Sequence, residues 1–196
     1  MSYELVAGFE THIELATKTK IFGGCTKKSG GAPTSHCCPV CIGLPGTLPK
    51  LNREVVRYAI RAGLAVHGEI AEISKMDRKN YCYPDLSKAY QISQLYAPLI
   101  IGGYVELSNG RKIRLHHIHI EEDAGKLIHQ HGDTYVDYNR GGGSLFLITF
   151  LLSKSFQSLT FVQLTKRESM LKSFSRLCVT SEFPTVRCRK AQCVAM

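Results

Sequence analysis

The sequence has 196 residues, a formal net charge of +9 and eight cysteines. Its basic balance points toward nucleic acid, but 8 of the 25 Lys and Arg residues and only 2 of the 16 acids lie after residue 143, which leaves a net charge of +3 before it. Three cysteines lie in that tail and Cys82 stands alone, so we exclude a secreted disulfide framework and expect a reducing, cytoplasmic compartment. We expect no secretion signal, because a strand pattern begins at Tyr3, and Leu145–Leu152 is too short to cross a membrane.

The first predicted element is a strand from Tyr3 to Leu15, where residues alternate between two faces. Because strand side chains point to alternate sides, Glu10, His12 and Glu14 lie in a row on one face. The alternative is an ordinary half-exposed strand with its charges in water.

The next motif is a C-x-x-C pair, Cys38 and Cys41, which forms one half of a zinc knuckle, with Cys25 thirteen residues upstream. Structural zinc sites close with four cysteines or with three cysteines and a histidine. Cys37 and His36 are therefore the candidates for the fourth ligand. The alternative is a metal-free loop with surplus cysteines, and no nucleophile–base set indicates a catalytic cysteine.

The stretch that follows is predicted to be scaffold. Asn52 can cap a helix at roughly Arg53–Val66, which has an apolar stripe. Strands are predicted at Tyr90–Leu95 and Leu99–Leu107, the second followed by a hairpin turn at Ser108–Gly110. One long helix among strands and hairpins predicts an α+β fold with a largely antiparallel sheet.

Residues Lys79–Gln94, KNYCYPDLSKAYQISQ, follow neither the helix nor the strand period. Three tyrosines, two lysines and two glutamines surround a turn at Pro84-Asp85. This composition predicts a surface that contacts a polar ligand, with a solvated loop as the alternative.

A second strand, Ile113–Glu122, places His117, His119 and Glu121 on one face. Two such strands facing a common cleft suit a divalent ion, since magnesium takes a few oxygen ligands and leaves other positions to water and phosphate. Contact with His12 is less usual for magnesium, so manganese or a bridging water is also considered. Strand alternation favours Glu121 over Glu122, although a twist at the strand end leaves both open.

The string VDYNRGG at Val136–Gly142 ends in glycines that let backbone approach a ligand closely. Phosphoryl transfer requires cations on the phosphoryl oxygens. The candidate phosphate and carboxylate clamps are Lys79, Lys88, Lys126 and Arg140. A plain glycine-rich turn is the alternative, and no GxxxxGK[ST] motif indicates a P-loop ATPase.

Several strings together resemble the B subunit of the tRNA-dependent amidotransferases, in the order found in that family. They are YELVAGFETHIEL at Tyr3–Leu15, CPVCIGLPGTLPKLN at Cys38–Asn52, RAGLA at Arg61–Ala65, the stretch Lys79–Gln94, HIHIEEDAGKLIH at His117–His129 and VDYNRGG at Val136–Gly142. The resemblance runs from about Tyr3 to Gly143, and family members are much longer than this chain. It implies part of a catalytic cradle domain that is similar to glutamine synthetase at the level of fold.

The resemblance implies an ATP-dependent ligase. ATP would phosphorylate the side-chain carboxylate of Glu or Asp esterified to tRNA, and ammonia from a glutaminase subunit would displace the phosphate. The implied partners are the amidase (A) subunit, the small C subunit and misacylated tRNA, and the implied cofactors are ATP, Mg²⁺ and a structural Zn²⁺. The rival hypothesis is a truncated, non-catalytic, zinc-containing RNA-binding or assembly fragment.

The expected site residues fall into three groups. The metal and catalytic group is Glu10, His12, Glu121 and Glu122 with Lys79, Lys88 and Arg140. The group for the nucleotide and the tRNA terminus is Tyr81, Tyr83, Asp85, Tyr90, Gln91, Lys126, Asp137 and Asn139. The zinc group is Cys25, Cys37, Cys38 and Cys41. Three positions depart from the family pattern: Gly23 replaces the first cysteine of a C-x-C pair, and Ser87 and Ala89 replace Pro and Gly.

The last 53 residues, 144–196, contain no Gly, His, Tyr, Asp or Asn, although turns draw on most of these residues. Residues Ser169–Met196 can be read one base out of frame, with free synonymous codons, as YVEKLQTIMRYLGVSDCQMQKGSVRCD, which is very like the later family sequence. We therefore expect a partial cradle domain over 1–143, with a possible zinc knuckle at 22–41. An out-of-frame, poorly folded tail would follow over 144–196.

Overall fold

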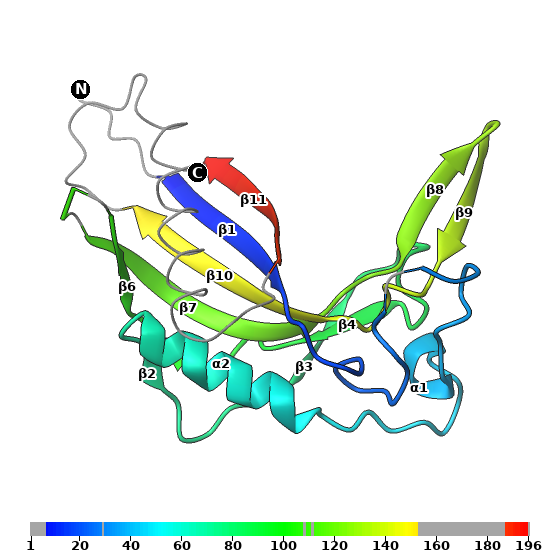
Figure 1. The fold of residues 1–196 in the computed structure, drawn as a ribbon, viewed down its shortest axis with the longest axis horizontal. Helices are drawn as coiled ribbons and strands as arrows, with labels where there is room; N and C mark the ends of the chain where they lie inside the picture. Colours follow the sequence, from blue (N-terminus) through cyan, green and yellow to red (C-terminus); the bar gives the residue numbers. More distant parts are fainter. Residues whose placement is uncertain (1–6, 29, 108, 111, 153–186, 196) are drawn as a thin grey trace.

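The computed structural model describes residues 7–28, 30–107, 109–110, 112–152 and 187–195 (Figure 1). Its main sheet has the order β11-β1-β10-β7-β5-β2, with β6 also paired to β7, and every pairing is antiparallel. The α+β fold with a largely antiparallel sheet is thus confirmed. The sheet strands are β1 (Ala7–Glu14), β2 (Glu69–Ile70), β5 (Ile100–Ile101), β6 (Tyr104–Glu106), β7 (Lys112–Glu122), β10 (Ser144–Leu152) and β11 (Arg187–Ala195).

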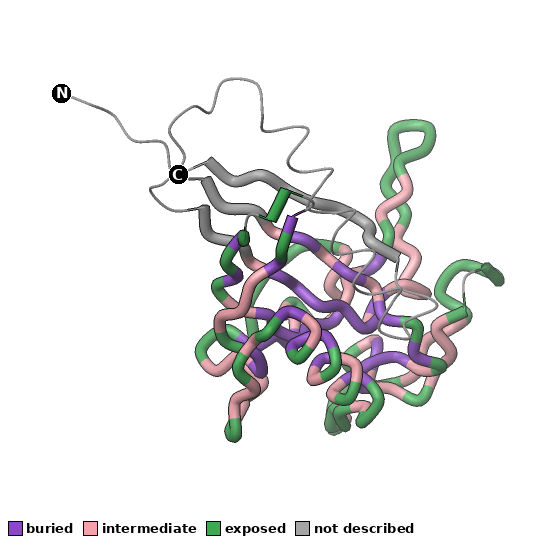
Figure 2. The backbone as a smooth tube through the Cα atoms, turned by 60° about the vertical axis from the view of Figure 1, so that its left-hand side comes forward, coloured by how far each residue is buried: buried purple, intermediate pink, exposed green. Residues whose placement is uncertain are grey.

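Two short two-stranded sheets and two helices complete the described chain. They are β3 (Asp77–Asn80) with β4 (Tyr90–Ser93), β8 (Lys126–Gln130) with β9 (Asp133–Asp137), and the helices α1 (Pro39–Ile42) and α2 (Arg53–Ala65). The β8–β9 hairpin projects from the main sheet, and its tip is exposed (Figure 2). No helix in the described ranges combines the length and apolar character needed to cross a membrane.

The centre of the sheet is β10, which lies between β1 and β7. Its Leu147 pairs with His12 on one side and with His119 on the other. The next row, two residues along, joins Glu14 to Glu121 through the same strand. Residues directly opposite each other share a face, so the polar rows expected on two separate strands lie on one face of one sheet.

The opposite face of the sheet packs on α2. Asn52 caps this helix as expected, because its side-chain oxygen accepts a hydrogen bond from the Glu54 backbone N–H at 2.9 Å. The buried stripe of α2, with Val55 and Ala59 fully covered, joins a core that includes Ile118 and Ile148. Burial of an amphipathic face supplies most of the stability of such a helix.

The sheet continues beyond residue 143, the domain boundary expected from composition. Ser144–Leu152 forms the central strand β10, and Leu145 and Ile148 are buried within it. Arg187–Ala195 forms β11 along the outer edge of β1. A buried strand needs no turn-forming residues, so their absence after residue 143 does not mark the end of the sheet. Residues 153–186 lie outside the described ranges, and the out-of-frame origin of the tail remains a prediction.

The prediction of one continuous strand at Leu99–Leu107 is wrong. This stretch is divided into β5 and β6 at Gly102 and Gly103, whose φ angles are +65° and +100°. A Cβ at Gly103 would lie 2.6 Å from the Val66 carbonyl oxygen, so a side chain does not fit there.

Three other expected elements are shorter than predicted or partly outside the described chain. The first strand is described from Ala7 onward, and β4 ends at Ser93. Of the predicted hairpin turn, Gly110 is described and has a φ of +77°. Ser108 lies outside the described residues.

A substitution at Gly63 tests the packing of α2 against the sheet. A Cβ there would lie 2.6 Å from Ile100 Cγ1 and 2.7 Å from Ile70 Cδ1. Helix propensity alone would make Gly63→Ala stabilising by about 1 kcal/mol. We expect the reverse, a lower free energy of unfolding, because overpacking costs about 1–3 kcal/mol. Urea denaturation should show this, with Leu64→Ala, at an exposed position, as a control that changes stability by less than about 0.5 kcal/mol. A stabilised Gly63→Ala variant would contradict the close contact.

Candidate functional site

The site begins where β1 and β7 approach each other across β10. His12 Nε2 lies 3.4 Å from Glu121 Oε1, although 108 residues of chain separate them. The Glu121 side chain is only 3% exposed, whereas that of His12 is 29% exposed. The pair therefore joins a buried carboxylate to a histidine that solvent or a ligand can reach.

The charge of Glu121 is stabilised by its neighbours. Burial raises the pKa of this carboxyl, but hydrogen bonds from His119 and His12 more than offset that effect and lower the pKa to about 2. Ser93 of β4 also donates to Glu121 Oε2 at 3.4 Å. In the same contact, the hydrogen bond to Glu121 raises the pKa of His12 against the opposing effect of burial. At neutral pH the site holds a charged carboxylate.

Three histidines extend this site along β7. His117 Nε2 lies 3.0 Å from His119 Nδ1, and the two rings stack. Burial, together with charge on His119 and His116, lowers the pKa of His117 to about 4. His117 is therefore neutral at neutral pH. The strand pattern placed His119 on this face, but its contact with Glu121 depends on side-chain positions that alternation does not fix.

Glu122 has different partners from Glu121. Its carboxylate accepts from Lys88 Nζ at 2.6 Å and from the Ile92 backbone N–H at 2.8 Å. Strand alternation favoured Glu121 as the inward-pointing metal ligand, and it is Glu121, not Glu122, that contacts His12. Lys88 is correspondingly paired with Glu122, and its ammonium also lies 5.7 Å from the centre of the Tyr90 ring.

A pocket of about 480 Å³ lies beside this face of the sheet. One of its lining residues is Glu14, which lies on the same face of β1 as His12, two residues further along. Four cationic and two acidic side chains line it, so its charge favours an anion. Lys27 and Lys28 were not predicted from the sequence, because no periodic element or motif marks them. The lining residues are Glu14, Lys27, Lys28, Gly30, Gly31, Lys126, Asp137, Asn139 and Arg140.

Part of the VDYNRGG string builds the wall of the pocket rather than projecting freely into it. Asp137 Oδ1 accepts from the Thr34 backbone N–H at 2.8 Å, and Asn139 Oδ1 accepts from the His36 N–H at 2.7 Å. Arg140 donates to the Ala124 and Gly125 carbonyl oxygens and pairs with Asp123 at 3.6 Å. These contacts hold the loop at 34–36 and the turn after β7 against residues 137–140.

The tyrosine-rich stretch lies on β3, β4 and the loop between them. Tyr81 and Tyr83 are about half exposed and stack with ring centres 5.6 Å apart. Gln91 donates to the Glu122 carbonyl oxygen at 2.5 Å, which ties β4 to the end of β7. Lys79 is exposed on β3 and is not among the described residues that line the pocket.

Two further positions in this loop have unusual environments. Asp85 Oδ1 is buried and has no hydrogen-bond partner in the described parts of the chain. Ala89 has a φ of +57°, a left-handed conformation that glycine adopts at lower cost. The left-handed backbone at this position thus accounts for the glycine of the family pattern.

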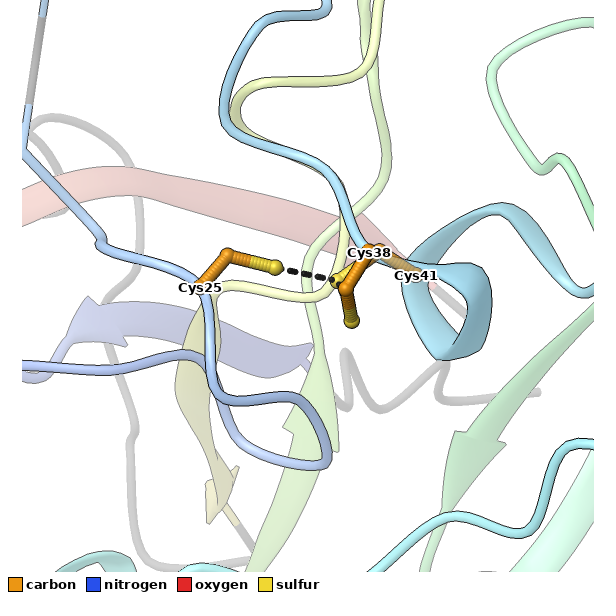
Figure 3. A group of neighbouring side chains, drawn as sticks. All are labelled: Cys25, Cys38 and Cys41. Atoms are coloured by element: carbon orange, nitrogen blue, oxygen red, sulfur yellow. Dashed lines mark hydrogen bonds between the residues drawn. The ribbon is translucent and has the colours of Figure 1, made fainter.

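Three cysteines converge at the second cluster. Cys25 Sγ lies 3.2 Å from Cys41 Sγ, and Cys38 Sγ lies 3.4 Å from Cys41 Sγ (Figure 3). The two other expected zinc ligands are not brought in: Cys37 Sγ donates to the Tyr138 carbonyl oxygen, and the His36 ring contacts the Lys28 carbonyl oxygen. The reason is local, since residues 36 and 37 precede the α1 turn and face the 138–139 loop.

The cysteine cluster has the donor atoms of a zinc site. Burial and hydrogen bonds with Cys41 and Cys38 raise the pKa of Cys25 to about 12. Burial also opposes ionisation of Cys38, but backbone N–H groups at Cys41 and Val40 and the neighbouring thiols lower its pKa to about 7. Three sulfur donors within 4.8 Å of one another match the chemistry of zinc.

The carboxylate residues are arranged differently from the cysteines. Among the described residues, the cysteines are the one group of three metal-type ligands whose donor atoms lie within 4.8 Å of one another. Glu10, His12, Glu121 and Glu122 therefore do not form a closed cage. A magnesium ion held at the His12–Glu121 pair would have to complete its shell with water and phosphate.

The His12–Glu121 contact makes a pH prediction. Glu121→Gln should lower the pKa of His12, because the carboxylate that raises it is removed while burial remains. In metal-chelated protein, imidazole Cε1–H NMR titration should show the change, with His12→Asn identifying the resonance. Stabilisation from charged His12 is complete below its ordinary pKa of 6.5 and is lost as pH rises through the raised pKa. The destabilisation by Glu121→Gln should shrink over that interval, and an unchanged His12 pKa would contradict the contact.

Comparison with known proteins shows the family of the chain. A sequence profile described as the GatB/GatE catalytic domain matches residues 5–173. The B subunit of the aspartyl/glutamyl-tRNA(Asn/Gln) amidotransferase of Thermoanaerobacter sp. (strain X514) is 56% identical over 176 residues, which cover 88% of this chain and 37% of the relative. The B subunits of the same name from Clostridium tetani and Lachnospira eligens are 49% identical over 192 residues (96% and 40% covered) and 57% identical over 152 residues (74% and 32%).

The chain thus spans two fifths or less of the length of these relatives. The profile match continues beyond Gly143, where the resemblance was expected to end, and includes the central strand β10. Since the profile covers most of the sequence, the chain belongs to the GatB/GatE family through its catalytic domain.

Proposed function

We propose that this chain carries the ATP-dependent amidation site of a tRNA amidotransferase. The observation that carries the proposal is the meeting of His12 and Glu121 on one sheet face, next to a cation-lined pocket. Phosphoryl transfer requires a metal ion and cations on the phosphoryl oxygens, and the carboxylate and the cationic side chains of the pocket would supply the two. The relatives are named as B subunits of aspartyl/glutamyl-tRNA(Asn/Gln) amidotransferases, which supports the same reaction class.

The proposed reaction has two steps. A side-chain carboxylate oxygen of Glu or Asp on tRNA attacks the γ-phosphorus of ATP, and ADP leaves with its bridging oxygen. Ammonia then attacks the acyl phosphate carbon, which releases phosphate, and a proton is lost to give the amide. Bound magnesium supplies charge neutralisation at the phosphoryl oxygens.

The protein groups would divide this work. Glu121 is already ionised at neutral pH and, with Glu10 and His12, would hold the magnesium ion. Lys126 would contact phosphate oxygens from the pocket wall. The Glu122–Lys88 pair would hold the end of β7 in place next to this site, since each partner neutralises the charge of the other.

The tRNA terminus would lie near the exposed tyrosines. Aromatic side chains stack on the unpaired bases at RNA ends, and Tyr81 and Tyr83 present a stacked, half-exposed pair. Ammonia would come from the amidase (A) subunit, assembled with the small C subunit.

The first functional prediction concerns the metal ligands. Glu10→Gln and His12→Ala should abolish ATP-dependent amidation of misacylated tRNA in a protein of the relatives' length that carries residues 1–143 of this sequence, assembled with its amidase. Loss of one electrostatic contact to the transferring group costs about 2.7–4 kcal/mol, or roughly two to three orders of magnitude in rate. Glutamine hydrolysis by the amidase and tRNA binding serve as internal controls, and both should remain largely intact.

Near wild-type amidation by both variants at saturating magnesium would show that β1 is only scaffold. The chain would then fit the rival role, a non-catalytic zinc-containing RNA-binding or assembly module.

The second functional prediction concerns the pocket. Lys126→Ala should raise the KM for ATP roughly tenfold to a hundredfold, because a hydrogen bond to a charged group contributes about 1.5–3 kcal/mol. Lys112→Ala is the matched control, since Lys112 lies on β7 with its ammonium over the Tyr104 ring and does not line the pocket. Steady-state kinetics with varied ATP should separate the two variants, and equal KM values would place the phosphates elsewhere.

A further inference from the structure

The fourth corner of the three-cysteine cluster is occupied by a glycine. A Cβ built on Gly23 would lie 2.9 Å from Cys38 Sγ, 3.0 Å from Cys41 Sγ and 3.7 Å from Cys25 Sγ. Any side chain at this position would therefore point into the cluster. Gly23 leaves that corner without a donor atom of its own.

The neighbouring donors do not fill the corner. Cys37 is committed to the Tyr138 carbonyl oxygen at 3.2 Å, and the His36 ring to the Lys28 carbonyl oxygen at 3.2 Å. Within the described residues, no further His, Cys, Asp or Glu joins the three cysteines as a ligand. Among these residues, the cluster therefore offers three thiols and no fourth donor.

The corner is also accessible. Gly24 is exposed, and a Cβ built on it would meet no atom within 4 Å. On another side the cluster is bordered by Gly142, where a built Cβ would lie 3.8 Å from Cys41 Sγ. Cys25 and Cys38 are only partly buried. The cluster therefore lies beside partly exposed backbone at Gly23 and Gly24, and its fourth corner holds the glycine at 23 rather than a donor side chain.

We propose that Cys25, Cys38 and Cys41 form a three-thiolate site for zinc whose fourth ligand is exchangeable and comes from outside the chain. Zinc is tetrahedral in protein sites, and sites with three protein ligands keep the fourth position open. A small thiol matches the donor set and fits the corner that Gly23 leaves without a side chain. The metal in this chain is therefore accessible to thiols and chelators, unlike the metal of a closed four-cysteine knuckle. The proposal does not depend on the amidation function.

Cobalt(II) bound to the full 196-residue chain tests the proposal, because thiolate-to-cobalt absorption reports the number of sulfur ligands. The protein is kept reduced with a phosphine, and 2-mercaptoethanol is then titrated in. Wild type should bind about one equivalent of cobalt, and the thiol should raise the absorption by about one third as a fourth thiolate joins three. Gly23→Cys should start at the higher absorption and should not respond to the thiol.

Two matched cysteine variants locate the ligands. Cys38→Ser should lose most of the cobalt absorption, whereas Cys37→Ser should behave as wild type, because Cys37 lies outside the cluster. If Gly23→Cys fails to fold, the thiol titration of wild type and this pair of variants still decide the matter.

Three results would overturn the proposal. A wild-type spectrum that does not respond to thiol would mean that the chain supplies a fourth ligand itself. Failure of wild type to bind cobalt would mean that three thiols do not retain a metal here. A Cys25–Cys41 disulfide that persists in the presence of the phosphine, detected by mass spectrometry, would make the cluster a redox pair.

Discussion

Two adjacent carboxylates are buried at the end of β7, and the surrounding structure compensates both charges. Glu121 and Glu122 are each about 2% exposed. A buried charge is costly unless it is paired and hydrogen-bonded. Glu121 is compensated from β1 and from its own strand, through His12 and His119, while Glu122 is compensated by Lys88. These ion pairs bring β1 and the tyrosine-rich loop to the same end of the sheet.

The same region is tied together a second time by backbone contacts around Gly125. Its N–H donates to the Asp85 carbonyl oxygen at 2.8 Å, and its carbonyl accepts from Arg140. A Cβ at Gly125 would lie 3.0 Å from Tyr138 Cδ1 and 3.1 Å from the Asp85 oxygen. Three of the sequence strings thus meet at one residue that has no room for a side chain. The turn after β7 is consequently a junction, and its glycine is required by close approach.

The cysteine-bearing segment and the pocket share two residues, Asp137 and Asn139. Asp137 and Asn139 hold the loop at 32–36, which also carries the cysteine-bearing segment, and the pocket opens beside the same residues. One site uses soft sulfur donors and the other hard oxygen and imidazole donors, so each favours a different metal. The loop at 32–36 thus contacts two residues that line the pocket, Asp137 and Asn139, just before the segment that carries Cys38 and Cys41.

The sequence by itself determined the elements whose cause is local. The alternation of β1 and β7 placed Glu10, His12 and Glu121 on strand faces, and the Asn52 cap and apolar stripe defined α2. It did not divide β5 from β6, because the break at Gly102 and Gly103 follows from the contact of Gly103 with Val66.

Only the tertiary structure decided which of these faces meet. The insertion of β10 between β1 and β7 sets the distance from His12 to Glu121, and this pairing depends on a strand that lies more than twenty residues beyond β7. Lys27 and Lys28 line the pocket, and Cys37 lies outside the cysteine cluster. Both positions depend on how loops pack against each other, which no sequence period reports. Periodicity reports the direction of a side chain relative to its own element, whereas the partners of that side chain depend on how the elements pack.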